Sequence, residues 1–193
     1  MIMVTQLAKK TYTVDEYLEL EIVSDIRNEY RNGEIIPMTG GTPNHNDISG
    51  NAYILLKALL KAKAYRVFHV DQRLWIPALK EYTYPDVMVV AKPLELQVGR
   101  KDTITNPSLI VEVLSRSTQS RDRSEKFAAY RTIDTFQEYI LIDQYRIHVE
   151  HYLKTAVNQW LFSEYDDPET AISLQCLNLK INIADLYDNI DFD

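Results

Sequence analysis

The sequence of 193 residues has little cysteine, glycine or proline, and it lacks a long apolar run. The one cysteine, Cys176, excludes an internal disulfide and a cysteine-based metal site, and it fits a reducing, cytoplasmic setting. Five glycines and seven prolines are too few for a disordered chain. No stretch approaches the roughly 18 apolar residues of a transmembrane helix, and the start, MIMVTQLAKK, does not read as a signal peptide. We therefore expect no contact with a membrane.

An excess of positive charge is also absent. The chain has 21 Lys and Arg against 28 Asp and Glu, a net charge of −7. Tight sequence-independent binding to nucleic acid depends on neutralising phosphates, so this balance disfavours it. A local basic surface is not excluded, because residues 116–131 hold five Lys and Arg against two acids. The ordinary globular composition and the length predict one domain over 1–193, with its core at about 13–165.

The local patterns predict an α/β (α+β) fold with a mixed sheet. Thr13 and Glu16 form a capping box before a short helix, and Asn44–Asp47 are expected to cap a long amphipathic helix that ends near Ala64. A further helix is predicted over 122–133. Strands are predicted at 27–30, 34–38, 66–71, 73–76, 82–90, 109–115, 138–143, 146–153 and 159–165. The first two flank an Asn-Gly turn, and 109–143 reads as a strand–helix–strand crossover with parallel strands.

One carboxylate interrupts the most apolar of these strands, LIVEVLS at 109–115. Alternation along a strand puts Glu112 on the same face as Ile110 and Leu114, so its charge would be buried. A buried charge is costly unless it is paired or bound to a metal. Taken alone, Glu112 favours a structural ion pair with a nearby arginine.

Two further acids stand at the starts of predicted strands. Asp86 follows Pro85, which lacks an amide donor and belongs at a strand edge or start, and Glu34 follows the Asn-Gly turn. Each alone is typical of a turn or hairpin residue. Together with Glu112, however, Asp86 can bring a second carboxylate to one divalent cation, with the main-chain carbonyl of Val113 as another oxygen ligand. Such an ion would polarise a phosphate and activate a water, which is phosphodiesterase chemistry.

Polar groups on two helices complete the candidate site. Asp122, Lys126 and Tyr130 are spaced i, i+4, i+8 and share one helix face, from which Lys126 could reach Glu112. The alternative is an exposed, salt-bridged stripe. His45 stands at a helix N-terminus, where amides attract phosphate, although it also fits a residue beside the cap with no further role.

A resemblance to a known family is carried by four runs: YRNGEIIPMTGGTPNHNDISGNAYILL, YPDVMVV, PSLIVEVLSRSTQSRDRSEKFAAYR and EYILID. In combination they resemble the Uma-type endonuclease family of the PD-(D/E)XK restriction-endonuclease-like superfamily. The likeness covers about residues 13–153. It implies a restriction-endonuclease-like core, with a central mixed sheet flanked by helices.

The resemblance also assigns roles to residues of this chain. It implies that Glu34 is the first acidic residue, Asp86 the aspartate after the proline, and Glu112 the second acid. The superfamily lysine would stand two residues after that acid, where this chain has Leu114. The resemblance implies that Lys126, on the next helix, takes its place.

Further polar positions match as well, namely Asp122, Tyr130 and His45, whereas Arg116 stands where the family usually has proline. The leading hypothesis is a magnesium- or manganese-dependent endonuclease that acts on DNA, with His45, Arg116 and Arg121 near phosphate and Asp122 and Tyr130 beside them. A catalytically inactive interaction module of the same fold and a small phosphate-ester hydrolase remain as alternatives. The tyrosine-rich strands between 139 and 165 further predict a homodimer.

Overall fold

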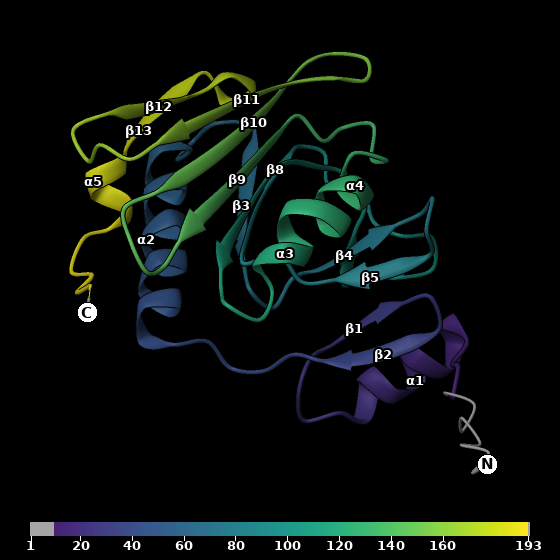
Figure 1. Ribbon diagram of the computed structural model, residues 1–193. Helices are drawn as coiled ribbons and strands as arrows, with labels where there is room; N and C mark the ends of the chain where they lie inside the picture. The colour runs from purple at the N-terminus through teal and green to yellow at the C-terminus, as the bar shows by residue number, and fades with distance from the viewer. Residues whose placement is uncertain (1–9, 193) are drawn as a thin grey trace, which may run out of the picture.

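The computed structural model describes residues 10–192. Residues 1–9, which carry most of the segment that we expect not to be a signal peptide, lie outside the described residues, as does residue 193. No helix within 10–192 has both the length and the apolar character to span a bilayer. The described chain forms two large sheets with helices on both sides of the larger one (Figure 1).

The larger sheet has six strands in the order β11-β10-β9-β8-β6-β3. Their bounds are Tyr65–His69 (β3), Val87–Ala91 (β6), Pro107–Leu114 (β8), Glu138–Asp143 (β9), Val149–Ala156 (β10) and Gln159–Tyr165 (β11). β8 and β9 pair in parallel and the other neighbours pair antiparallel. The predicted parallel crossover and the mixed sheet are therefore confirmed.

The second sheet has five strands in the order β2-β1-β5-β4-β7. Their bounds are Asn28–Arg31 (β1), Glu34–Pro37 (β2), Arg73–Ile76 (β4), Glu81–Thr83 (β5) and Thr103–Ile104 (β7). The predicted Asn-Gly hairpin is confirmed, because both turn residues have positive φ, +50° at Asn32 and +81° at Gly33. Helix α1 (Val14–Val23) covers this sheet, and its predicted capping box is present.

Helices cover the two faces of the six-stranded sheet from opposite sides (Figure 1). Helix α2 (Pro43–Leu59) packs on one face over an aliphatic core. A helical segment made of α3 (Gln119–Arg121), η1 (Asp122–Lys126) and α4 (Phe127–Tyr130) packs on the other. The last elements are β12 (Ala171–Leu174), the 3-10 turn η2 (Gln175–Leu177), β13 (Leu179–Asn182) and α5 (Ile183–Leu186), and they contribute buried side chains to the aliphatic core.

Four local predictions are wrong in detail. The long helix ends at Leu59 rather than near Ala64, because residues 60–64 form a turn. Thr42, not the 44–47 segment, caps α2, because Pro43 fits the first helical position and Thr42 Oγ1 accepts a hydrogen bond from the amide of His45. The predicted strand 82–90 is split into β5 and β6, which belong to different sheets, because Pro85 has no amide to donate to a ladder. The predicted helix 122–133 begins three residues earlier and contains a π-helical turn.

Candidate active site

The strand register brings two of the predicted acids together. β6 pairs antiparallel with β8, with Val87 opposite Val111. When this register is continued by one residue, Asp86 lies opposite Glu112. Directly opposed residues of an antiparallel pair project from the same face, with Cβ atoms about 5 Å apart. The amide of Val113 donates to Oδ2 of Asp86 at 2.7 Å, which anchors the loop aspartate to the strand that carries Glu112.

His45 lies on the other side of Asp86. Its Nε2 is 3.4 Å from Oδ2 of the aspartate. Burial opposes the charged form of each group, but the contact outweighs it. The pKa of the Asp86 carboxyl is held below its usual range by His45, and the pKa of His45 is raised by Asp86 and Glu112. The N-terminus of α2 therefore presents an imidazole that holds a proton more tightly than a free histidine does.

Glu112 is enclosed on the opposite face of the sheet from α2. Its Oε1 accepts a hydrogen bond from the Tyr130 hydroxyl at 2.7 Å and lies 3.0 Å from Nζ of Lys126. Burial raises the pKa of Glu112 to about 8, the charges of Asp86 and Asp122 act in the same direction, and Lys126 opposes them. This carboxyl therefore holds a proton more tightly than an exposed glutamate does.

The helical segment over Glu112 presents the predicted polar face. Lys126 Nζ contacts Oδ1 of Asp122 at 3.2 Å as well as Glu112. Burial alone would lower the pKa of Lys126, but Glu112, Asp122 and Glu29 together raise it well above its usual value. These contacts confirm that Asp122, Lys126 and Tyr130 share one face, and that face is buried rather than solvent-exposed. The π-helical turn lies at this point of the segment, a feature common at functional sites.

A fourth acid, Glu29 of β1, joins this group, and the sequence analysis missed it. Its carboxylate accepts a hydrogen bond from Thr83 and forms an ion pair with Arg121. Burial opposes its ionisation, but Lys126 and Arg121 hold the pKa of Glu29 below its usual range. One signal was available, because Glu29 is an acid inside a predicted strand, where glutamate is depleted.

The predicted acid Glu34 lies elsewhere. It stands at the turn end of β2, opposite Arg31, and among the described residues it does not line the cavity that holds the other acids. The structure therefore puts Glu29, rather than Glu34, beside Asp86, Glu112 and Lys126. Glu34 directly follows the tight turn, so its side chain lies at the end of the hairpin. Glu29 lies within β1.

The acids line an open cavity of about 390 Å³. One wall is the 38–42 segment, where Gly41 matters because a Cβ there would lie 2.8 Å from Nδ1 of His45. The opposite wall is the loop after β8, in which exposed Arg116 packs its guanidinium 5.1 Å from the Tyr145 ring. Arg121 lines the same cavity but is bound to Glu29. The cavity thus has acids at its base and a cation at its rim.

The donor set suits a hard divalent cation. Asp86 and Glu112 supply carboxylate oxygens beside the main chain of Val113, and magnesium is held by few carboxylates with water in its remaining positions. Oδ1 of Asp122 is buried without an aligned hydrogen-bond donor among the described residues, and its negative charge is paired with Nζ of Lys126 at 3.2 Å. No three His, Cys, Asp or Glu of residues 10–192 converge as a complete protein cage. An ion would therefore depend on two carboxylates, a carbonyl and water.

Comparisons with known proteins agree with this architecture. The family model Uma2, described as "Putative restriction endonuclease", matches residues 14–184. Two proteins of Synechocystis are similar. Uncharacterized protein sll1609 is 44% identical over 155 residues, covering 80% of this chain and 88% of its own. Uncharacterized protein slr1290 is 32% identical over 180 residues, covering 92% of each chain.

A solved structure shares the fold. It is the crystal structure of "a putative nuclease belonging to DUF820" from Anabaena variabilis, which superposes with a TM-score of 0.73 at 20% identity and covers 91% of this chain and 97% of that chain. The mixed sheet and its flanking helices thus define a protein of the restriction-endonuclease-like class, and the expected fold class is confirmed. Since the family model spans most of the sequence, the chain belongs to the Uma2 family.

Proposed function

We propose that this protein is a metal-dependent endonuclease that hydrolyses phosphodiester bonds in DNA. One observation carries the proposal: Asp86 and Glu112 lie level on adjacent strands, with Lys126 3.0 Å from Glu112, in one open cavity. Converging carboxylates with a buried amine suit the negative charge and the attacking water of phosphodiester hydrolysis. The nuclease description of the family supports the same reaction class.

Asp86 and Glu112 would hold a magnesium or manganese ion, with the carbonyl of Val113 as a third protein ligand. When bound, such an ion lowers the pKa of a coordinated water and withdraws charge from a phosphate oxygen. The hydrogen bond from the Val113 amide fixes the Asp86 carboxylate on one side. The Tyr130 hydroxyl fixes Glu112 on the other.

Lys126 would act as a fixed positive charge. Its raised pKa keeps the ammonium protonated at neutral pH, so it does not serve as the general base. Nζ lies beside Glu112 and can donate to a phosphate oxygen or to the attacking water. Glu29 and Asp122 hold this ammonium in place from two further directions.

DNA is the proposed substrate because the accessible groups at the cavity rim suit a phosphate backbone. Arg116 is exposed there, and His45, whose pKa is raised above its usual value by Asp86, lies at the N-terminus of α2. Contacts of this kind position a strand without reading its bases. We therefore expect cleavage with little sequence preference.

A plasmid-nicking assay with magnesium or manganese tests the proposal. Wild type should nick supercoiled DNA, and Asp86→Asn and Glu112→Gln should each lower the rate at least about a hundredfold, since each removes one of the two carboxylates that hold the ion. Glu34→Gln is the matched control, because it also removes one carboxylate but lies outside the cavity. Equal nicking by wild type and Asp86→Asn would overturn the assignment.

A second candidate is a non-enzymatic interaction module. One observation favours it: Glu112 is already paired with Lys126 and Tyr130, and Leu114 occupies the usual lysine position. Calorimetric titration with manganese separates the two proposals. Binding that Asp86→Asn abolishes supports the enzyme, whereas the module predicts no binding at millimolar metal.

A homodimer also remains a proposal. β11 is an edge strand of the six-stranded sheet, and two of its large apolar side chains, Leu161 and Phe162, are 54% and 46% exposed. Exposed apolar edge strands favour pairing with another chain. Light scattering at micromolar concentration should give twice the chain mass, and a monomer there contradicts the proposal.

A further inference from the structure

A basic segment lies away from the acidic cavity, in the second half of α2 and the strand after it. Residues 48–70 contain four Lys and Arg and no Asp or Glu, although the whole chain has a net charge of −7. Clustered like charges on one stretch of an acidic protein indicate a surface for an oppositely charged partner.

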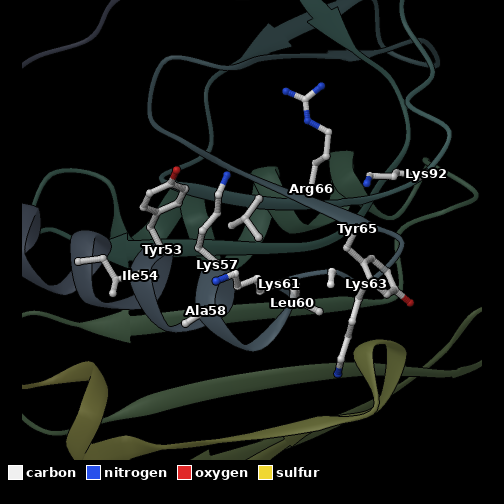
Figure 2. A pocket seen from close by; sticks show the side chains of 12 residues that line it. Tyr53, Ile54, Lys57, Ala58, Leu60, Lys61, Lys63, Tyr65, Arg66 and Lys92 are labelled. Carbon is white, nitrogen blue, oxygen red and sulfur yellow. The ribbon is translucent and has the colours of Figure 1, made fainter.

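These cations surround a second cavity, of about 610 Å³, which we name the basic pocket. Figure 2 shows the side chains around it, with Lys57 on α2, Lys61 in the turn after α2, Arg66 on β3 and Lys92 just after β6. Lys63, from the turn between α2 and β3, completes five cations. Among the described lining residues, none is acidic.

The five cations of the basic pocket are exposed, and they differ from most of the less exposed cations of this protein in having no carboxylate partner among the described residues. Arg31, Arg73, Arg121, Arg123 and Lys126 each form an ion pair with a carboxylate. Within residues 10–192, no carboxylate lies at ion-pair distance from any cation of the basic pocket. Unpaired like charges around one hollow repel one another, so an anion that bridges them would be stabilised.

The helix terminus does not account for this cluster. Cations near a helix C-terminus are stabilised by the backbone dipole, which explains Lys57 in the last turn of α2. The effect is confined to the last turn. Arg66 on β3 and Lys92 after β6 line the same pocket and do not belong to the helix, so a separate anion is the better explanation.

The wall of the basic pocket is largely apolar. Leu60 and Val67 are buried behind it, and Ile54 is 63% exposed at its edge. Two tyrosines also line it. Tyr65 is fixed by a hydrogen bond of 3.0 Å to the carbonyl of Cys176, and Tyr53 stacks on His69 with ring centroids 5.2 Å apart. A matching ligand therefore has flat or apolar groups as well as negative charge.

We infer that the basic pocket binds a single-stranded stretch of nucleic acid. Its phosphates would contact the lysines and Arg66, and an unstacked base would pack against the tyrosine-lined wall, as in other single-strand sites. The inference rests on the proposed nuclease function, because it supplies a second contact for the same substrate. From His45 to Lys57 the helix rises 12 residues, or about 18 Å, which a strand of several nucleotides spans.

Fluorescence anisotropy with a labelled 20-nucleotide DNA in EDTA tests the inference without cleavage. The double variant Lys57→Glu/Lys61→Glu should bind at least about tenfold more weakly than wild type. Its plot of log affinity against log salt should be shallower by roughly 0.7 for each lost phosphate contact. The matched control is Lys101→Glu/Lys180→Glu, which makes the same charge change at exposed positions outside the pocket and should bind as wild type does.

A second variant tests the apolar wall. Tyr53→Leu keeps an apolar side chain but removes the ring, so affinity should fall severalfold while the salt slope stays unchanged. Equal affinity of wild type and the double lysine variant overturns the inference. Loss of binding to anionic phospholipid vesicles without loss of DNA binding overturns it too and assigns the pocket to a lipid surface.

The two proposals fail in different measurements. If wild type does not nick DNA but the lysine variant binds DNA more weakly by anisotropy, the basic pocket inference is supported and the hydrolytic function is contradicted. If wild type nicks DNA and the lysine variant binds and nicks DNA as well as wild type does, the hydrolytic function is supported and the basic pocket inference is contradicted.

Discussion

The two faces of the six-stranded sheet bury different kinds of side chain. The face under α2 is mainly aliphatic, with Ile48, Leu56 and Val111 among its fully buried members. It also buries the carboxylate of Glu138, which lies 3.5 Å from Nε2 of His151. The face under α3, η1 and α4 buries aromatic rings beside Glu112, Asp122 and Lys126. One strand, β8, serves both, because its alternate residues point to opposite faces.

The difference indicates a division of labour between the faces. Each large aliphatic side chain that is fully buried contributes about 1.5–3 kcal/mol, whereas buried charges stabilise little beyond their own desolvation. The aliphatic face is thus the main source of stability. The stability of the aliphatic face offsets the cost of burying charges on the other face. That charged face carries the groups that can take part in a reaction. The predictions below test this contrast, from the largest expected effect to the smallest.

Lys126→Met should be the most destabilising single change. It leaves Glu112 and Asp122 buried without their cation, and breaking a buried pair from one side costs about 3–5 kcal/mol. Urea unfolding measures the loss, and Lys63→Met, an exposed lysine, is the control. A decrease in the free energy of unfolding of under about 1 kcal/mol would show that the ion pairs of Lys126 are not needed to stabilise this face.

Leu56→Ala should destabilise by about 3 kcal/mol, because it opens a cavity in the aliphatic face. Nicking per folded molecule should not change, since Leu56 lies away from the acids. Leu59→Ala is the control from the same helix, because that leucine is partly exposed and should cost less. A specific loss of nicking in folded Leu56→Ala would mean that the two faces are not independent.

The metal-free protein should lose stability as the pH rises from about 4.5 towards 8. Glu112 has a pKa of about 8 in the folded chain against an ordinary value of 4.5, so the folded state keeps a proton that the unfolded state releases. That contribution is complete below pH 4.5 and is lost as the pH approaches 8. Urea midpoints at pH 5, 7 and 9 in EDTA measure it.

Glu112→Gln should flatten this pH dependence. His45, whose pKa is also raised, acts in the same direction, so Glu112→Gln/His45→Gln should flatten it further. If the urea midpoints of the double variant fall with pH as steeply as those of wild type, the result would contradict the pKa shifts of Glu112 and His45. Leu56→Ala serves as the matched control, because it lowers the midpoints at every pH without changing their trend.

Cys176 offers the mildest test, as a reporter on the aliphatic face. Burial raises the pKa of its thiol, and the carboxylate of Glu138, 3.1 Å away, adds to the effect. Labelling of the native protein by a thiol reagent at pH 8 should therefore be slow compared with the unfolded chain. Leu56→Ala should speed it by opening that face. Labelling as fast as in urea would contradict the packing.

Local patterns predicted most elements and three of the four acids of the site, namely Asp86, Glu112 and Asp122. Strands β9 and β11 have the predicted bounds, and the buried Glu112 and the strand-start Asp86 could be recognised from alternation and from Pro85. For Glu29 the sequence offers only an acid inside a predicted strand, because what brings it to the site is a contact between β1 and Arg121, 92 residues apart. Sequence periodicity describes one element at a time, whereas this contact depends on how two sheets meet.

The break between β5 and β6 has a wider consequence. The chain passes at Pro85 and Asp86 from the five-stranded sheet into the six-stranded one, while Glu29 belongs to the first sheet and Glu112 to the second. The acids thus meet at the junction between the two sheets. The hydroxyl of Tyr17 donates a hydrogen bond of 2.7 Å to the carbonyl of Asn28. A change at Tyr17 would therefore shift β1 and move Glu29 relative to Asp86 and Glu112, with which Tyr17 shares no hydrogen bond.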